Sequence, residues 1–380
     1  MTTKIAVLGC GLVGGLIAHD LASDPGIEVH AFDASERALA ALEDLPRIRT
    51  ARADLSDPKQ IANAVRAADA VVGAVPGRYG TQMLRTVIEA GKPIADISFS
   101  PENPLALHDL AVEKGVTAVV DCGVSPGLSN LAVGRAAYHL DDVRHAVIYV
   151  GGLPVERHWP YEYRIVFSAT DVIEEYTRPA RLVENGRTVV KPALSEVELL
   201  DFPGIGTLEA FNTDGLRTLL ATIEADNMKE KTLRYPGHAD RMRMLRESGF
   251  FSDEPLETSA GKVRPRELTE ALLFRNWKRP AAEEELTVLR VAVDGSKNGS
   301  RIEYTFDLLD RTDRSSGATS MARTTGFPCA IMARLLARGE YRDPGVRPPE
   351  SFASNDSVYN TMVDELRRRG VRFEERSRTL

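Results

Sequence analysis

A glycine-rich turn between a short apolar run and a helical pattern constrains the fold of this chain more than any other feature. The apolar run at 4–9 leads into the string GCGLVG at 9–14, and an amphipathic helical pattern follows. The next apolar run ends on Asp33, nineteen residues after Gly14. A strand, a glycine turn, a helix and an acid at the end of the next strand are typical of a dinucleotide-binding βαβ unit. The alternative is a glycine turn that holds no ligand.

Each glycine of this motif has its own expected task. Gly9 permits the tight turn, Gly11 lets the backbone approach a pyrophosphate, and Gly14 allows the helix to pack closely on the strand. The pyrophosphate would lie at the positive end of the helix. The expected cofactor contacts in this motif are Gly9, Gly11, Leu12, Val13 and Gly14.

Asp33 decides which dinucleotide is expected. A carboxylate at this position accepts hydrogen bonds from the ribose hydroxyls and repels a 2′-phosphate. Ala34 and Ser35 supply no cation, and Arg37 lies beyond them. The sequence therefore predicts NAD rather than NADP.

Further strand ends should line the same cleft, because ligands of open parallel sheets bind at the carboxyl ends of the strands. A plain turn is the alternative at each of them. The expected contacts are Asp54 and Leu55 near the adenine, Ala74, Val75 and Pro76 along the cofactor, and Asp96, Ser98, Cys122 and Gly123 toward the nicotinamide.

The order of apolar runs predicts an α/β protein of two domains. Short apolar runs alternate with helical patterns through the first third, which indicates a Rossmann-type parallel sheet. The middle third has longer, alternating runs and a hairpin signal at 293–301, typical of an open mixed sheet. We expect an NAD-binding domain at 1–124 plus 318–380, with an inserted α/β substrate and oligomerisation domain at 125–317. Within the last part, 344–350 is predicted as an extended loop and 354–370 as a helix.

Composition excludes several classes of partner. The formal net charge of −7 argues against nucleic acid or an anionic membrane surface. No apolar run is long enough to span a bilayer, and the N-terminus has no signal-peptide pattern. The three cysteines lie far apart and outside any Cys/His cluster, so we expect no disulfide and no metal site. A reducing cytoplasm is the expected compartment.

Several longer motifs carry a family resemblance. The chain resembles the saccharopine dehydrogenase-like family, and within it the lysine 6-dehydrogenases, in the glycine motif and in VVDCGVSPGLSN (119–130), YVGGLP (149–154), LSEVELLDFPGIGTLEAFNTDG (194–215), KTLRYPGHAD (231–240) and MARTTGFPCA to GVRPPE (321–350). The resemblance implies an NAD-linked oxidative deamination of the ε-amino group of L-lysine. The product would be 2-aminoadipate 6-semialdehyde, which cyclises to a piperideine carboxylate. It also implies a homo-oligomer.

Removing a hydride from a carbon that bears an amine requires a neutral amine, so a base that titrates near the working pH is useful. His238 is the histidine that lies in a family-like motif, and we expect it in the site. Asp121 ends the strand expected nearest the nicotinamide, where a carboxylate would hold the substrate ammonium or orient a water. A polar Pro-Gly turn that places His238 outside any site and a helix-capping aspartate are the alternatives.

The expected substrate-binding residues are cations and hydroxyls of the second half: Arg217, Arg234, Tyr163, Tyr235 and Thr213. Guanidinium groups bind carboxylates in a bidentate manner. Arg217 stands where the lysine enzymes have small uncharged residues, and as a second carboxylate clamp it would fit saccharopine. A saccharopine-type or carboxynorspermidine-type enzyme acting on a secondary amine is therefore the alternative, and a non-catalytic NAD-binding protein is a third hypothesis.

Overall fold

The computed structural model describes residues 2–166, 169–259, 261–280 and 282–380, and their contacts divide the chain into two units. Unit 1 comprises 1–141, 217–223 and 322–373, and unit 2 comprises 142–216, 224–321 and 374–380. The boundaries expected from the sequence differ at three places. Helix α6 (Leu128–His139) and the short helix α8 (Leu219–Thr222) belong to unit 1, and the last strand belongs mainly to unit 2.

Unit 1 is built on a seven-stranded parallel sheet with the order β17-β6-β5-β4-β1-β2-β3. Its order reverses between β1 and β4, which is the topological switch point where such sheets bind ligands. The strands are β1 (Thr3–Leu8), β2 (Ile27–Asp33), β3 (Ile48–Arg52), β4 (Ala70–Gly73), β5 (Ile94–Asp96), β6 (Thr117–Val119) and β17 (Gly345–Arg347). The segment expected as an extended loop thus contributes the edge strand β17, because it pairs with β6.

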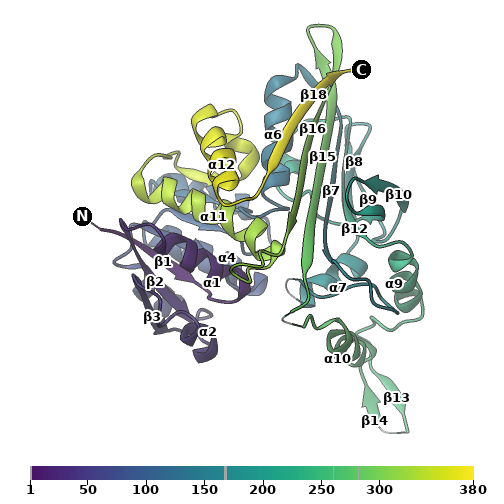
Figure 1. Ribbon diagram of the computed structural model, residues 1–380, viewed down its shortest axis with the longest axis horizontal. Coiled ribbons are helices and arrows are strands. Elements are labelled where there is room, and N and C mark those ends of the chain that lie inside the picture. The colour runs from purple at the N-terminus through teal and green to yellow at the C-terminus, as the bar shows by residue number, and fades with distance from the viewer. Residues whose placement is uncertain (1, 167–168, 260, 281) are drawn as a thin grey trace. The chain divides into compact units, whose positions relative to one another are not determined.

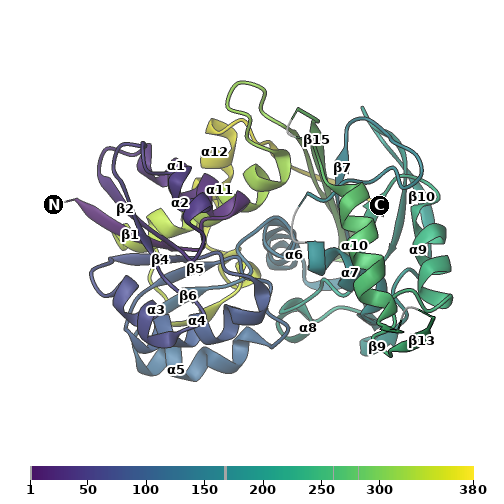
Figure 2. The same ribbon diagram turned by 90° about the horizontal axis from the view of Figure 1, so that it is seen from below.

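Helices cover both faces of this sheet. Figure 2 shows α3, α4 and α5 on one face. Apolar side chains of alternate strand positions, such as Ala6 and Leu8, pack with these helices. On the other face α11 approaches α1 at Gly326, and its Cys329 thiol contacts the carbonyl of Ala95. The helices of unit 1 are α1 (Leu12–Ala22), α2 (Glu36–Ala40), α3 (Pro58–Val65), α4 (Gly77–Glu89), α5 (His108–Glu113), α6, α8, α11 (Ser320–Arg338), α12 (Asp356–Arg368) and the 3-10 turns η1 (Pro104–Leu107) and η2 (Pro349–Phe352).

Unit 2 carries a nine-stranded mixed sheet with the main order β10-β11-β12-β7-β15-β16-β18, and β8 and β9 attach beside β12. Figure 1 shows its long strands β7, β15 and β16 side by side. The strands are β7 (Asp142–Pro154), β8 (Ala180–Glu184), β9 (Arg187–Lys191), β10 (Glu198–Phe202), β11 (Gly206–Asn212), β12 (Asn227–Arg234), β15 (Glu285–Lys297), β16 (Ser300–Arg311) and β18 (Phe373–Thr379). The predicted hairpin is confirmed: Lys297 pairs with Ser300 across a turn in which Asn298 and Gly299 both have positive φ.

One face of this second sheet packs against helices. Phe211 shares an apolar cluster with α7 (Ala169–Thr177), α9 (His238–Glu247) and α10 (Pro265–Trp277). The neighbouring positions Leu208 and Ala210 point to the opposite face, where the buried cluster is made of strand and loop residues. A small hairpin, β13 (Leu256–Thr258) with β14 (Gly261–Val263), extends from this unit.

Candidate functional site

The glycine motif has the geometry of a pyrophosphate cradle. Gly9 has a φ of +96°, and a Cβ there would lie 2.3 Å from the carbonyl oxygen of Ala74. A Cβ on Gly14 would lie 1.9 Å from the carbonyl oxygen of Gly9, so helix and strand are in direct backbone contact. Around Gly11, by contrast, a Cβ would meet no atom within 4 Å. Gly9 and Gly14 are therefore needed for close packing, and Gly11 leaves open space beside the start of α1.

The start of α1 is prepared for an anion. Its first residue follows Gly11, which has no side chain to cap the helix, and its first turn holds no acid. The N–H groups of a helix's first turn have no partner within the helix and carry a partial positive charge. Leu12 is 55% exposed, whereas Val13 is partly covered and lies close to Gly326. These residues fit the pyrophosphate of a bound dinucleotide.

Asp33 is fixed at the end of β2. Its Oδ2 accepts a hydrogen bond of 2.6 Å from the backbone N–H of Cys10, and its Oδ1 accepts one of 2.8 Å from Ser35. The carboxylate therefore sits against the glycine turn, where the ribose of a dinucleotide bound to α1 would lie. Arg52, at the end of β3, is mostly exposed and pairs with Glu36.

The other expected cofactor contacts follow β3 and β4. Asp54 is exposed, and hydrogen bonds from the hydroxyl and N–H of Ser56 lower its pKa. Leu55 is buried in the sheet's core cluster. Ala74, Val75 and Pro76 connect β4 to α4, with Pro76 capping the helix. Their contact with a cofactor stays a prediction.

A buried charged cluster lies where β5 and β6 end. Asp96 is the last residue of β5, and Asp121 follows β6. The Arg217 guanidinium binds Asp121 at two points, Nη2 to Oδ1 at 3.0 Å and Nε to Oδ2 at 3.3 Å. Its Nη1 donates to the carbonyl of Ser100, and its plane lies over the ring of Phe99. Both side chains of the pair are nearly inaccessible, at 6% and 2% exposure.

Asp96 is the third member of this cluster. Burial raises the pKa of Asp96 to about 7, hydrogen bonding by Ser98 opposes the rise, and the charge of Asp121 adds to it. Its Oδ1 accepts a hydrogen bond from the N–H of Ser98, and the absence of a side chain at Gly73 makes room for the carboxyl group. A carboxyl group that titrates near neutrality can bind or release a proton at working pH. The structure thus places three of the predicted residues, Asp96, Asp121 and Arg217, in one cluster.

The segment after β6 is held by its own backbone. Cys122 donates its N–H to the carbonyl of Asp96, and Gly123 donates to Pro126 in the turn before α6. Cys122 and Cys329 are buried free thiols that interact with each other.

In unit 2, His238 begins α9 inside the aromatic cluster. The carbonyl of Tyr161 accepts a hydrogen bond from Nδ1 at 3.1 Å, so Nε2 accepts a hydrogen bond from the hydroxyl of Tyr176 at 2.9 Å. Burial, with the charge of Arg234 as a lesser cause, lowers the pKa of His238 to about 3. Both ring nitrogens have partners and the ring is neutral at working pH, which suits a structural role better than proton transfer.

Arg234 and Tyr163 lie beside this histidine. The Arg234 guanidinium binds Glu175 and stacks 4.6 Å from the centre of the Tyr163 ring, whose centre is 5.4 Å from that of His238. The hydroxyl of Tyr163 and the Nε of Arg234 are buried without a hydrogen-bond partner in the described chain. The structure therefore brings these three predicted residues together, in unit 2.

Two predicted residues of unit 2 lie elsewhere. Tyr235 donates its hydroxyl to the carbonyl of Pro154 and lies under Arg157. Thr213 is buried against Thr232 and donates to Glu230, whose pKa burial raises to about 8. Sequence reasoning missed Glu230 and Glu175, because an acid in an exposed strand or helix pattern looks the same as a buried one.

Other kinds of site are not indicated. Over the described ranges, no cluster of three or more His, Cys, Asp or Glu residues has a metal-binding arrangement. No helix found in the described residues is long and apolar enough to cross a membrane.

Comparisons with known proteins match both halves of the chain. Residues 5–119 match the saccharopine dehydrogenase NADP binding domain, and residues 123–371 match the saccharopine dehydrogenase C-terminal domain. A saccharopine dehydrogenase [NADP(+), L-glutamate-forming] of Schizosaccharomyces pombe is 21% identical, over 89% of this chain and 91% of its own. A carboxynorspermidine synthase of Vibrio cholerae is 24% identical, over 90% and 91%.

Among solved structures, the apo saccharopine dehydrogenase (L-Glu forming) of Saccharomyces cerevisiae has the same fold. It superposes with a TM-score of 0.83 at 18% identity, and the match covers 99% of this chain and 100% of that one. The fold class expected from the sequence is therefore confirmed, and so is a pyridine-nucleotide binding domain. The two domain matches together cover all but residues 1–4, 120–122 and 372–380, and this chain belongs to the saccharopine dehydrogenase family of oxidoreductases.

Proposed function

We propose that this chain is an NAD-dependent oxidoreductase that deaminates the ε-amino group of L-lysine. The ε-carbon loses a hydride and the resulting iminium adds water. Ammonia then leaves, which gives 2-aminoadipate 6-semialdehyde and, by ring closure, a piperideine carboxylate. NAD, when bound, accepts the hydride. The protein's own residues position the amine, hold charges and move protons.

Asp33 supports NAD within this proposal. Its two oxygens accept hydrogen bonds from the backbone N–H groups of Cys10 and Ser35, so the carboxylate is fixed beside the glycine turn. A 2′-phosphate would bring two further negative charges against it. The matched family model is described as an NADP binding domain, and the preference for NAD is proposed from this chain's own Asp33.

The pairing of Arg217 is the observation that carries the choice of substrate. An unpaired guanidinium at the end of β6 would bind the additional carboxylate of saccharopine. Arg217 instead gives Nη2 and Nε to Asp121 and Nη1 to Ser100. Since these three donors are already bound, they are not free to bind a substrate carboxylate. The cluster instead offers the two carboxyl groups of Asp96 and Asp121 beside one cation. That arrangement suits a small amine better than a second carboxylate.

Within the cluster, the two carboxyl groups have different tasks. Asp121, which Arg217 holds in place by a bidentate ion pair, stabilises the positive charge of the substrate amine and of the iminium. Asp96, with a pKa raised to about 7, accepts the proton that the amine must lose. Two carboxyl groups of one site commonly divide electrostatic and acid–base roles when their surroundings differ.

A secondary-amine substrate is the alternative function. The named relatives include saccharopine dehydrogenases and a carboxynorspermidine synthase, and their substrate classes favour a saccharopine-type or carboxynorspermidine-type reaction. A non-catalytic NAD-binding protein is a further alternative, which the glycine motif alone would allow.

A substrate panel read by nicotinamide absorbance tests the proposal. The full chain is incubated with NAD or NADP and with L-lysine, saccharopine, carboxynorspermidine or simple diamines. We expect NADH and ammonia from lysine without any keto acid. Turnover restricted to saccharopine or carboxynorspermidine would establish the alternative, and cofactor binding without turnover on any amine would establish the third hypothesis.

A homo-oligomer is part of the proposal, with the outer strands of the second sheet as its surface. Leu199 in β10 and Val190 in β9 are 63% and 65% exposed. Light scattering after size exclusion measures the state, and Leu199→Glu is expected to shift it toward the monomer. A monomeric wild-type chain would remove this part of the proposal and leave the reaction unaffected.

A further inference from the structure

Two motifs singled out in the sequence meet the segment that carries Arg217 at one buried acid of unit 1. Glu350 closes the string GVRPPE, lies in η2 and is 7% exposed. Asn130 closes the string VVDCGVSPGLSN and lies in the first turn of α6, fully buried. Thr218 and Thr222 follow Arg217 in the chain and belong to the same unit. These residues are far apart in sequence, so a contact between them joins separate segments.

The carboxyl group of Glu350 makes that contact. Its Oε2 accepts a hydrogen bond from Asn130 Nδ2 at 3.2 Å, and its Oε1 accepts one from the hydroxyl of Thr222 at 2.7 Å. The hydroxyl of Thr218 is a third partner, and it also accepts from Asn130 Nδ2 at 3.4 Å. One carboxyl group thus connects η2, α6 and the segment 217–223.

The three partners of Glu350 are neutral side chains. Burial raises the pKa of this carboxyl group, and the hydrogen bonds from Thr218, Thr222 and Asn130 oppose the rise. A buried polar group is tolerated when such bonds offset the loss of water. Because the partners carry no charge, they recognise the shape and the oxygen atoms of the group, and an amide of the same size would suit them.

The loop that carries Asp121 is tied to the same point. A Cβ on Gly134 of α6 would lie 2.6 Å from the Cα of Glu350, so this helix and η2 are in direct contact. The Oδ1 of Asn130 accepts the backbone N–H of Gly127 at 3.2 Å. Gly127 ends the loop between Asp121 and α6. The position of this loop is therefore fixed through Asn130.

Both members of the Asp121–Arg217 pair thus lie in segments that are held at Glu350. Arg217 has a φ of 52°, which a residue with a Cβ keeps only where its surroundings determine it. We propose that Glu350 is a positioning residue, which holds 217–222 so that the Arg217 guanidinium meets Asp121 at two points. This role rests on the proposed function, because Glu350 acts through the pair to which part of the reaction is assigned.

The variant Glu350→Met tests the role with L-lysine and NAD. It keeps the length of the side chain and removes the hydrogen bonds. We expect kcat to fall by about tenfold to a hundredfold, since a displacement of about 1 Å has effects of this size. KM for NAD should stay at the wild-type value. Glu350→Gln keeps one acceptor for Asn130 and supplies a donor to Thr222, so it should recover most of the lost kcat.

A double-mutant cycle shows whether Glu350 acts through Arg217. In the Arg217→Met background, Glu350→Met should change kcat by less than about twofold, because the guanidinium that it positions is gone. Full losses that multiply in the double variant would overturn the proposal. An equal loss of kcat in Glu350→Gln and Glu350→Met would also overturn it, since the hydrogen bonds would then not be the cause.

Hydrogen exchange measures the positioning without any turnover. The N–H groups of 220–223 donate to carbonyl groups within 217–219. They should exchange about tenfold faster in Glu350→Met. They should also exchange faster, by a smaller factor, in Thr222→Val, which removes one bond at an exposed position.

The exchange measurement separates this proposal from the proposed function. Unchanged exchange in both variants overturns the positioning role, whether or not the wild type deaminates lysine. A wild type that turns over no amine, with faster exchange in both variants, overturns the function and supports the positioning of the pair. Wild-type kcat in Glu350→Met overturns the positioning role and leaves the function in place.

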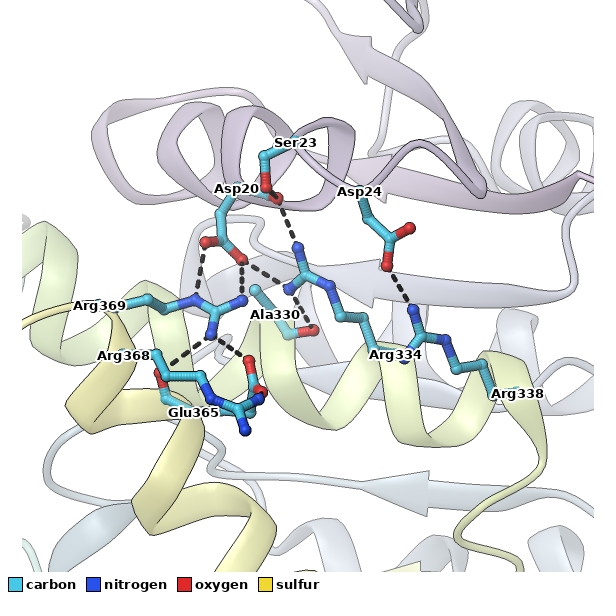
Figure 3. Close-up of polar contacts among 9 residues, drawn as sticks. All are labelled: Asp20, Ser23, Asp24, Ala330, Arg334, Arg338, Glu365, Arg368 and Arg369. Carbon is cyan, nitrogen blue, oxygen red and sulfur yellow. Dashed lines mark hydrogen bonds and ion pairs between the residues drawn. The ribbon is translucent and has the colours of Figure 1, made fainter.

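Asp20 provides the matched control, because it is a nearly buried acid that joins segments of the same unit (Figure 3). It binds Arg334 of α11 at 2.6 Å and Arg369, which follows α12, at 2.7 Å. Helix α1 connects the end of β1 to the start of the parallel strand β2, so Asp20 in its last turn lies toward the sheet edge opposite the strand ends.

The control variant is Asp20→Leu. It should lower the urea midpoint, since two buried guanidinium groups lose a partner. It should keep the wild-type kcat and the wild-type exchange of 220–223. If Asp20→Leu lowers kcat as much as Glu350→Met does, a general loosening of unit 1 is the cause and the positioning role is overturned.

Discussion

At the scale of single residues, the Asp121–Arg217 pair shows how a local cost is offset by a specific contact. Both residues have left-handed backbones, with φ of 51° and 52°. Each such conformation costs on the order of 1 kcal/mol or more in a residue with a Cβ. The bidentate ion pair, buried beside Asp96, holds both in place. Strain with a buried charge pair at strand ends is typical of functional sites.

The variant Arg217→Met tests the role of this pair. Without the guanidinium, two carboxyl groups share a buried site, so the pKa of Asp96 is expected to rise further. Turnover should fall at neutral pH, and the pH profile of kcat should move to higher pH. Arg217→Lys should restore part of both. If Arg217→Met instead raises KM for the amine at constant kcat, Arg217 binds the substrate directly. Urea unfolding of each variant shows whether a loss of activity comes from a loss of stability.

Asp33 gives a second residue-scale prediction. Asp33→Ser removes the carboxylate that would accept the ribose hydroxyls and repel a 2′-phosphate, so NAD should bind about tenfold more weakly. NADP should bind better than it does to the wild type. Fluorescence titration with both reduced cofactors measures the two affinities. Asp44→Ser, an exposed acid of the same unit, is the control. An unchanged ratio of NAD to NADP affinity would show that another residue sets the preference.

At this scale, sequence reasoning located groups but not their partners. Asp121, Arg217 and Asp96 were each predicted as site residues, and they do lie together. Their roles were assigned one by one, because Arg217 is 96 positions from Asp121 and no local pattern reports such a pairing. For the same reason the burial of His238 was not foreseen: Trp277 and Tyr176, which surround it, come from other helices.

At the scale of elements, the strand–turn–helix of β1 and α1 joins packing and binding in one motif. Periodicity and glycine spacing are local signals, so this element was predictable from the sequence. The edge strand β17 was not, because three residues that pair with β6 have too little periodicity to separate a strand from an extended loop. Short elements take their state from tertiary neighbours.

Two alanine substitutions in this element separate packing from binding. Gly14→Ala places a Cβ 1.9 Å from the carbonyl oxygen of Gly9, so the melting temperature is expected to fall by several degrees. Gly11→Ala meets no protein atom within 4 Å. It should leave the melting temperature unchanged and weaken NAD binding, because its methyl group occupies the cofactor's approach. Equal effects of the two variants on both measurements would contradict this division.

At the scale of the whole molecule, the chain crosses between its two units several times. Residues 217–223 return to unit 1 from within the second half, and the last strand joins the second sheet after α12 has packed in unit 1. The alternation of strands and helices predicts two sheets, but it contains no signal for such returns. Long-range pairing determines where each unit ends.

Buried carboxyl groups in both units give the molecule a predictable response to pH. Burial raises the pKa of Asp96 to about 7 and of Glu230 to about 8, and it raises the pKa values of Glu209 and Glu285 as well. An acid whose folded pKa exceeds its unfolded value stabilises the fold below the unfolded pKa. That contribution is lost as the pH rises through the folded pKa. His238, with a lowered pKa, has the opposite effect, which is lost as the pH falls below about 6.5.

The melting temperature should therefore decrease as the pH rises from about 6 to 8. Glu230→Gln is neutral at every pH, so this variant should lose less stability over the same interval. Scanning calorimetry at half-unit steps measures both slopes. Glu224→Gln makes the same change of net charge at an exposed position and should keep the wild-type slope. If both variants flatten the curve equally, the response comes from the net charge of −7 rather than from the buried carboxyl group.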